Sequence, residues 1–295
     1  MTRVTQGMLS RSSLAYLQQS LSRTGDLQER LATGRQINRP SDSPTGTVTA
    51  MLTRSSLTRT RGHLAGADNA KGWLDTADSA LQGASSMLIR ARDLTVQGAN
   101  ASVGDVGRKN IASELRSIRD GLLEMANTRF GDRLLFSGTG NPAELFVDGP
   151  LGFVYQGDPH SVTRTVAEGI KLPINVTGTE AFGPNGNTVF DVLDQVIEDL
   201  ELNPDAVSGH LASIDEAHNR LLTALGTIGA RANRLESLVD RATDQEMNLR
   251  TRLSSVEDVD LPETIMELQM QEVAYQAALS ATSRVIQPSL LDFLR

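Results

Sequence analysis

Both ends of this chain carry a narrow apolar stripe with the spacing of a helix. The first stripe consists of Leu14, Leu17, Leu21, Thr24 and Leu31, and the second of Ile265, Leu268, Tyr275, Leu279 and Ile286. Apolar residues three and four positions apart lie along one side of a helix. Because a narrow stripe cannot bury itself, it needs a partner helix. We therefore expect the two ends to pair with each other or to join other copies.

Large apolar side chains extend this pattern into the closing segment, where nothing local can cover them. Burying each one contributes roughly 1.5–3 kcal/mol. We predict that the terminal helices form an assembly interface, made by Leu14, Leu17, Leu21, Leu31, Leu268, Tyr275, Leu279, Ile286, Leu290, Leu291, Phe293 and Leu294.

The two ends differ in charge. Residues 1–62 hold nine Arg, no Lys and three acids, a balance of +6, whereas residues 255–295 hold seven acids and two Arg. Such ends attract each other. A basic arm could also bind nucleic acid, but the chain is acidic overall, at −8, and only 4% of its residues are aromatic. We therefore expect no nucleic-acid partner.

Composition excludes several classes of site. The chain has no cysteine, so it has no disulfide, thiolate nucleophile or cysteine metal site. The first 20 residues lack the apolar run of a cleaved signal peptide. No stretch approaches the roughly 20 apolar residues of a membrane span. We expect either a cytoplasmic protein or one that uses a specialised export route.

Proline positions divide the chain into helical and non-helical parts. No proline occurs between Pro44 and Pro142 or between Pro204 and Pro262, whereas five of the ten fall within 142–184. A proline inside a helix costs about 3 kcal/mol, so the proline-free tracts are predicted as long helices. Within them, residues 67–91 keep a strict alternation of three and four between Leu and Ala. Further helices are predicted at 105–129, 190–200 and 214–239.

The proline-rich tract instead predicts strands, because β-forming residues alternate there between Gly, Pro and Asp turns. The expected fold is mainly α: a long antiparallel helical bundle or coiled coil from the paired terminal segments, with a small β-rich insert. The expected domains are a terminal assembly domain (1–42 and 258–295), a helical bundle (43–140 and 186–257) and a β-rich outer domain (141–185). We expect the helices to form their core without the insert.

Signals for enzyme chemistry are weak. The four histidines, His63, His160, His210 and His218, have no metal-ligand spacing, and surface positions are the better interpretation. No base, nucleophile and orienting group can be argued together. We expect no catalytic residue, cofactor or metal.

The segment 31–46 is more specific, and it reads LATGRQINRPSDSPTG. Its simplest interpretation is a helix end at Gly34, a loop, and a new helix starting near Pro44. The segment also resembles the N-terminal signature of the bacterial flagellin superfamily, although Ser43 stands where a second Asp is common. The residues that carry this resemblance are Gly34, Arg35, Ile37, Asn38, Pro40, Asp42 and Pro44.

Other segments resemble the same superfamily in the same order. They are WLDTADSAL at 73–81, LIRARDL at 88–94, GARANRLE at 229–236 and IQPSLLDFLR at 286–295. Residues 38–44, 126–139 and 155–158 (YQGD) look more like members at the junction between hook and filament than like flagellin itself.

This resemblance implies a non-enzymatic adaptor at the hook–filament junction, which forms a ring between the preceding hook-associated protein and flagellin and templates filament growth. It also implies export by the flagellar type III route and a chaperone that holds the C-terminal arm. A filament-forming minor flagellin is the first alternative. A cytoplasmic coiled-coil regulator or enzyme is the more distant one.

Overall fold

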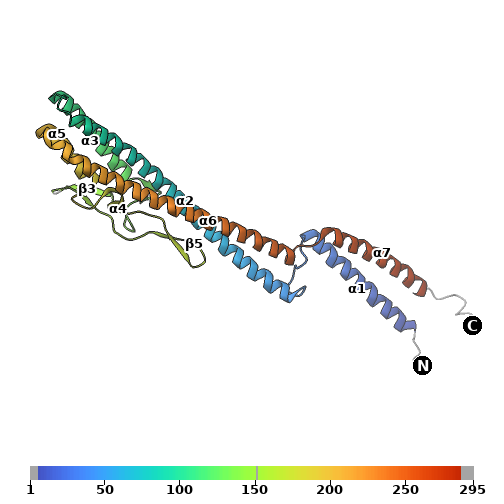
Figure 1. Cartoon of the computed structure of the whole chain (residues 1–295). Coiled ribbons are helices and arrows are strands. Elements are labelled where there is room, and N and C mark those ends of the chain that lie inside the picture. Colours follow the sequence, from blue (N-terminus) through green and yellow to red (C-terminus); the bar gives the residue numbers. More distant parts are fainter. Residues whose placement is uncertain (1–5, 151, 287–295) are drawn as a thin grey trace, which may run out of the picture. The chain divides into compact units, whose positions relative to one another are not determined.

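The computed structural model describes residues 6–150 and 152–286 (Figure 1). Its α-helices are α1 Gln6–Thr33, α2 Pro44–Gly98, α3 Asp105–Ala126, α4 Gly178–Phe182, α5 Val189–Leu202, α6 Leu211–Glu257 and α7 Leu261–Ile286, with a 3-10 helix at Pro204–His210. Its strands are β1 Arg129–Phe130, β2 Arg133–Leu134, β3 Phe146–Gly149, β4 Gly152–Tyr155, β5 Thr163–Ala167 and β6 Ile170–Pro173. The predicted mainly α fold with a small β insert is confirmed.

The chain forms two compact units. The first contains residues up to Arg59 and from Glu246 onward, and the second is Thr60–Gln245. Helices α2 and α6 each contribute to both units. The predicted three-part division of the chain stays a prediction.

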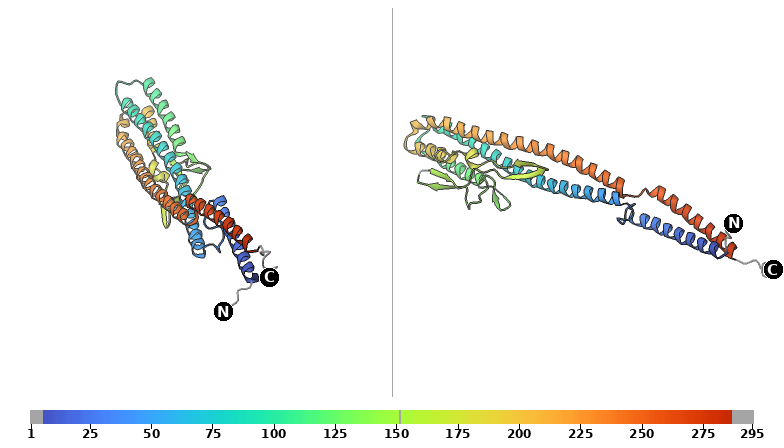
Figure 2. Two further views of the ribbon diagram at one scale, coloured as in Figure 1. Left: turned by 90° about the vertical axis from the view of Figure 1, so that its right-hand side faces the viewer. Right: turned by 90° about the horizontal axis from the view of Figure 1, so that it is seen from below.

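In the first unit, α1 and α7 lie side by side and antiparallel (Figure 2). The Gln271 amide donates to the Ser20 hydroxyl at 2.8 Å, and the Val259 N–H donates to the Gly34 carbonyl at 3.1 Å. The expected pairing of the two ends is therefore present within one copy, as far as the described residues extend.

This pair covers only part of the predicted stripes. Leu17, Leu31, Leu268 and Tyr275 are half-buried, whereas Leu14, Leu21 and Leu279 are exposed by 56%, 58% and 43%. The side chain of Ile286, together with Leu290, Leu291, Phe293 and Leu294, lies outside the described residues. The part-buried polar pair Ser20 and Gln271 lies in the seam between the two helices, and much of the apolar surface faces outward.

In the second unit, helices α2, α3, α5 and α6 form an antiparallel bundle. The predicted stripe at 67–91 is buried along its full length, from Ala67 to Ala91. Facing helices are also joined by ion pairs at the bundle surface. These pairs are Arg92–Asp215, Arg90–Glu114 and Arg116–Glu201, each with a closest approach of 2.6 Å.

The β insert consists of separate antiparallel hairpins: β1 with β2, β3 with β4, and β5 with β6. Phe146 pairs with Tyr155 and Gly149 with Gly152 in the second hairpin. The third hairpin has an irregularity between Thr165 and Ala167. The strands β1 and β2, which have only two residues each, lie before the tract in which strands were predicted.

The hairpins share one hydrophobic core with the helices, contrary to the expectation that the helices form their core alone. Phe190 of α5 is fully buried, and its ring lies 5.0 Å from that of Phe146 and 5.3 Å from that of Phe153. The Phe153 N–H also donates to the Asp191 carboxylate at 2.7 Å. Large aromatic rings bury more area than a thin Leu/Ala bundle can supply, so the insert completes the core of α5.

We expect Phe153→Ala to lower the free energy of unfolding of this unit by about 3 kcal/mol, because it removes a buried ring. The loss should appear in the helical circular dichroism transition, since β4 and α5 share one core. The exposed neighbour on the same strand, Val154, provides the matched control, and Val154→Ala should change little. An unchanged helical transition in Phe153→Ala would show that the insert is energetically separate.

Candidate functional site: the terminal helix pair and its joint

The turn after α1 holds the family-like signature residues and is bound to the link between α6 and α7. Gly34 ends α1 with a φ of 67°, which a residue with a side chain adopts only with strain. The Gln36 N–H donates to the Glu257 carbonyl at 2.7 Å, and Arg35 forms a β-bridge with Asp258. Residues more than 200 positions apart thus form one joint.

Inside the turn, Asp42 organises the backbone. Its carboxylate accepts from the N–H groups of Arg39 at 2.8 Å and Asn38 at 3.0 Å. These two backbone bonds lower the pKa of Asp42, so the carboxyl stays ionised in the fold. The Ser43 hydroxyl accepts from the Gly46 N–H at 3.1 Å and caps the start of α2. A serine is therefore sufficient where the flagellin-type signature commonly has a second Asp.

An ion pair completes the joint. The Arg54 guanidinium lies 2.7 Å from the Glu257 carboxylate, whose side chain is only 7% exposed, whereas that of Arg54 is 47% exposed. A carboxylate in such a position needs a partner, because desolvating an unpaired charge is costly. Neither residue was among the predicted site residues, because their separation of 203 positions leaves no local signal in the sequence.

We expect Arg54→Met to weaken the joint by about 1–2 kcal/mol, because the shielded Glu257 carboxylate loses its partner while some solvent still reaches it. Amide hydrogen exchange in the first turn of α7 should become faster. Arg39→Met is the matched control, since the Arg39–Glu29 pair is exposed on both sides and contributes little. Equal exchange in the two variants would contradict a special role for Arg54.

The terminal pair also presents apolar residues on its outer faces. Besides Leu14 and Leu21, the large apolar side chains exposed in the described parts of α1 and α7 are Met8, Tyr16, Leu261, Ile265, Met266, Met270, Val273 and Leu279. Scattered exposed apolar residues are normal, but a concentration on one helix pair indicates a surface that binds another protein. The exposed apolar side chains of α1 and α7 can therefore pack against another protein.

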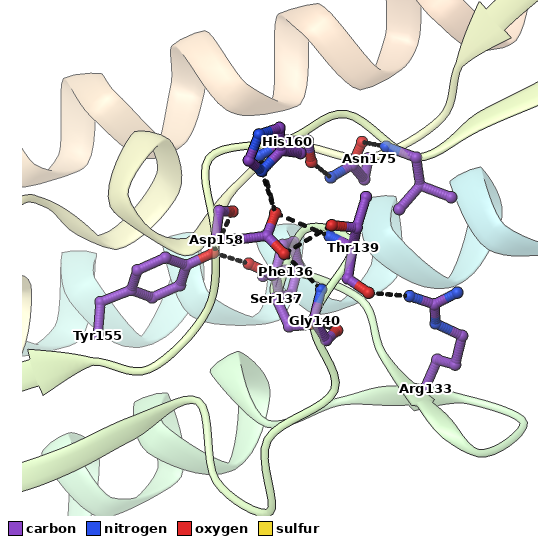
Figure 3. A network of polar contacts seen from close by, with 10 residues as sticks. Arg133, Phe136, Ser137, Thr139, Gly140, Tyr155, Asp158, His160 and Asn175 are labelled. Atoms are coloured by element: carbon purple, nitrogen blue, oxygen red, sulfur yellow. Dashed lines mark hydrogen bonds and ion pairs between the residues drawn. The ribbon is translucent and has the colours of Figure 1, made fainter.

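A second arrangement of family-like segments lies in the β insert, where residues 126–139 meet residues 155–158 (Figure 3). The Asp158 carboxylate accepts from the Thr139 hydroxyl at 2.7 Å, the Gly140 N–H at 2.6 Å and the His160 N–H at 2.8 Å. The Tyr155 hydroxyl donates to the Phe136 carbonyl at 2.8 Å. Asp158 thus joins the loop after β2 to the end of β4.

The electrostatics of this network follow from its donors. The Thr139 hydroxyl, together with backbone N–H groups, holds the pKa of Asp158 well below its usual range. Burial raises the pKa of Tyr155 to about 12. Gly138 lies beside Asp158 with a φ of 74°, and a Cβ there would overlap the Asp158 carbonyl. These hydrogen bonds hold the loop after β2 against the end of β4 and so shape the surface of the insert. We call this network of Asp158, Thr139, Gly140 and Tyr155 the Asp158 lock.

We expect Asp158→Asn to destabilise the protein most near neutral pH. The folded pKa of Asp158 is depressed, so its contribution is present above the unfolded pKa of about 4 and is lost as pH falls below it. The gap in unfolding free energy between wild type and Asp158→Asn should therefore shrink from about pH 6 to about pH 3. Asp148→Asn, at an exposed site on β3, should resemble wild type throughout. A gap that stays constant would contradict the lock.

His218 and His210 each contact a polar side chain of the fold. The His218 ring lies 3.0 Å from the Ser85 hydroxyl, joining α6 to α2, and the His210 ring lies 2.6 Å from the Asp199 carboxylate. Within residues 6–150 and 152–286, no group of three or more His, Asp or Glu side chains is arranged to hold a metal ion. None of the helices in that part of the chain has the length and apolar character of a membrane span.

Family models match both helical regions of the chain. The bacterial flagellin N-terminal helical region matches residues 4–141, and the C-terminal helical region matches residues 211–294. The chain belongs to the bacterial flagellin family. It is a flagellin-like structural protein of the bacterial flagellum, as the resemblance of its signature segments implied.

Individual relatives include both a hook-associated protein and a flagellin, the two kinds of protein that the sequence resembles. The chain is 25% identical to flagellar hook-associated protein 3 of Salmonella typhimurium, with 94% of each chain covered. It is 28% identical to flagellin of Listeria innocua, with 99% of each covered.

Solved structures of hook-associated proteins share the fold. FlgL of Bacillus cereus matches with a TM-score of 0.61 and 22% identity, covering 69% of this chain and 99% of that one. Flagellar hook-associated protein 3 of Legionella pneumophila matches with a TM-score of 0.65 and 15% identity, covering 70% and 98%.

Proposed function

We propose that this protein is a structural adaptor of the flagellum, which forms a ring at the junction between the preceding hook-associated protein and the flagellin filament. The observation that carries the proposal is the apolar outer surface of the α1–α7 pair, together with membership of the flagellin family. The similarity to hook-associated protein 3 supports a hook-associated position. The segments 38–44, 126–139 and 155–158, which resemble junction members more than flagellin, favour that position over a place in the filament.

In this role the terminal pair packs against neighbouring subunits as flagellin ends do, and the first filament subunits use it as a template. The second unit, with its Asp158 lock, provides the surface that differs from flagellin and contacts the preceding ring. Affinity across such surfaces is the sum of many modest contacts with a few dominant apolar side chains. No catalytic group is required.

Export and assembly follow from the same apolar surface. A monomer with exposed apolar ends needs protection before assembly, so a flagellar export chaperone that holds the C-terminal arm is the expected partner. The protein would leave the cell by the flagellar type III route without a cleaved signal peptide. It would then remain outside the cell at the hook–filament junction.

A minor flagellin is the second candidate. The observation that favours it is the 28% identity to Listeria innocua flagellin across 99% of both chains. The more distant alternative, a cytoplasmic regulator or enzyme, gains no support from membership of a structural flagellar family.

The position of a labelled copy distinguishes the two candidates. Because the chain has no cysteine, Glu168→Cys in the exposed turn between β5 and β6 provides a single site for a maleimide dye. One fluorescent spot at the distal end of each hook is the expected result. Labelling along whole filaments would overturn the adaptor proposal in favour of a minor flagellin.

A further inference from the structure

Helices α2 and α6 leave a groove between them in the second unit, with a volume of about 380 Å³. Its floor is apolar, since Leu74 and Leu235 are buried and Val239 is half-buried. A groove of this kind accepts the apolar face of another helix.

The rims of this groove are strongly acidic. Asp68 and Asp75 lie on α2, Glu236 and Asp240 lie on α6, and the one cation among the lining residues is Lys71. All four acids are exposed, and none of them is in an ion pair within the described residues. A groove lined by charges of one sign focuses its field and attracts a partner of the opposite sign.

The same chain carries a surface of complementary character near the start of α2. Val48, Met51 and Leu52 are exposed by 57%, 64% and 66%, although they are large apolar side chains. Arg59, also exposed, lies seven positions after Leu52 and therefore on the same side of the helix. No acidic residue occurs between Asp42 and Asp68, so the charge that α2 itself contributes to this apolar face is the positive charge of Arg59.

We infer that the groove of one copy binds the face formed by residues 48–59 of α2 from a neighbouring copy. Leu52 would lie over the apolar floor, and Arg59 would lie among the four rim carboxylates. The inference rests on the proposed function only in requiring that several copies assemble.

The two surfaces of this contact are different, so the contact is heterologous. A heterologous contact repeats from copy to copy and closes into a ring when the rotation between copies permits it. The contact would therefore link the members of the proposed ring side by side. Opposite charge gives it specificity and a fast encounter more than raw affinity.

Cross-linking of full-length chains tests this contact directly. Single-cysteine variants Leu52→Cys and Asn233→Cys are mixed at high protein concentration and oxidised, since Asn233 lines the groove. We expect a mixed dimer as the main product. In the matched control, Leu52→Cys is mixed with Leu222→Cys, which is exposed on α6 but does not line the groove. Circular dichroism checks that every variant is folded.

Charge reversal makes the test specific. Glu236→Arg in the groove copy should lower the mixed-dimer yield about fivefold, and Arg59→Glu in the other copy should restore most of it. An equal yield with Leu222→Cys, no mixed dimer, or no effect of charge reversal would overturn the inference. Capture of flagellin or of the preceding hook-associated protein by a cross-linker on Asn233→Cys in isolated hooks, in place of a second copy, would overturn it too.

The experiment separates this inference from the proposed function. A labelled copy along whole filaments would reject the junction position, yet the solution cross-link would still report on the groove. Conversely, a labelled spot at the hook with no mixed dimer would keep the junction position and reject the groove.

Discussion

A strain that lacks this protein should carry bare hooks and release flagellin monomers into the medium. Under the proposed function, the first flagellin subunits need a surface of flagellin-like ends on which to order their own ends. Fixing the backbone of each residue costs about 1–2 kcal/mol, so flagellin ends should order more readily against a surface whose helices are already paired. We expect the number of filaments per cell to fall nearly to zero.

Electron microscopy of the hooks and immunoblotting of the medium measure this result. Expression of the wild-type chain from a plasmid should restore filaments, which shows that the loss is due to this protein alone. Normal filaments in the deletion strain would refute the adaptor and support a minor flagellin. Loss of the hooks themselves would place the protein earlier in assembly.

The long helices could be predicted from the sequence because their buried residues recur at a regular helical spacing. Residues 67–91 alternate Leu and Ala without interruption, and the structure buries that entire stripe. The helix α5 was also predicted closely, since its apolar residues are dense and Pro204 follows its end. In such segments a single periodic pattern defines which face of the helix is buried.

The terminal stripes were less informative, because a narrow stripe interrupted by polar residues permits more than one rotation of the helix. The predicted stripe places Leu14, Leu17 and Leu21 on one face, whereas in the paired helices Leu17 is half-buried and the other two face outward. The interior position of Ser20 depends on its bond to Gln271, 251 positions away. Nothing in the local pattern around either residue indicates that bond.

The candidate site, too, could be predicted from the sequence only in part. Gly34, Asn38 and Asp42 could be found as a turn, because Gly, Asn and Asp have known turn chemistry. The Arg54–Glu257 pair could not be found, since it depends on the place where two distant helices meet. The insert was misjudged for a related reason. Its phenylalanines are spread from 136 to 190 in the sequence, and only the folded chain brings their rings together.

The exposed leucines of α1 should be essential for assembly although they contribute little to the monomer. We expect the double variant Leu14→Asp and Leu21→Asp to abolish filament attachment and motility. Both side chains are more than half exposed, so the free energy of unfolding should change by less than about 1 kcal/mol. In an assembled ring they would be buried, where two carboxylates without partners are strongly unfavourable.

Leu222→Asp is the matched control, because Leu222 is exposed by 47% on α6 within the other unit. It should leave unfolding and motility close to wild type. Immunoblotting of the medium separates failed assembly from failed export: the double variant should still be exported, and it should accumulate outside the cell as monomer. If the double variant attaches normal filaments, the outer face of α1 is not an assembly surface, and the residues that bind the next subunit must lie elsewhere on the chain.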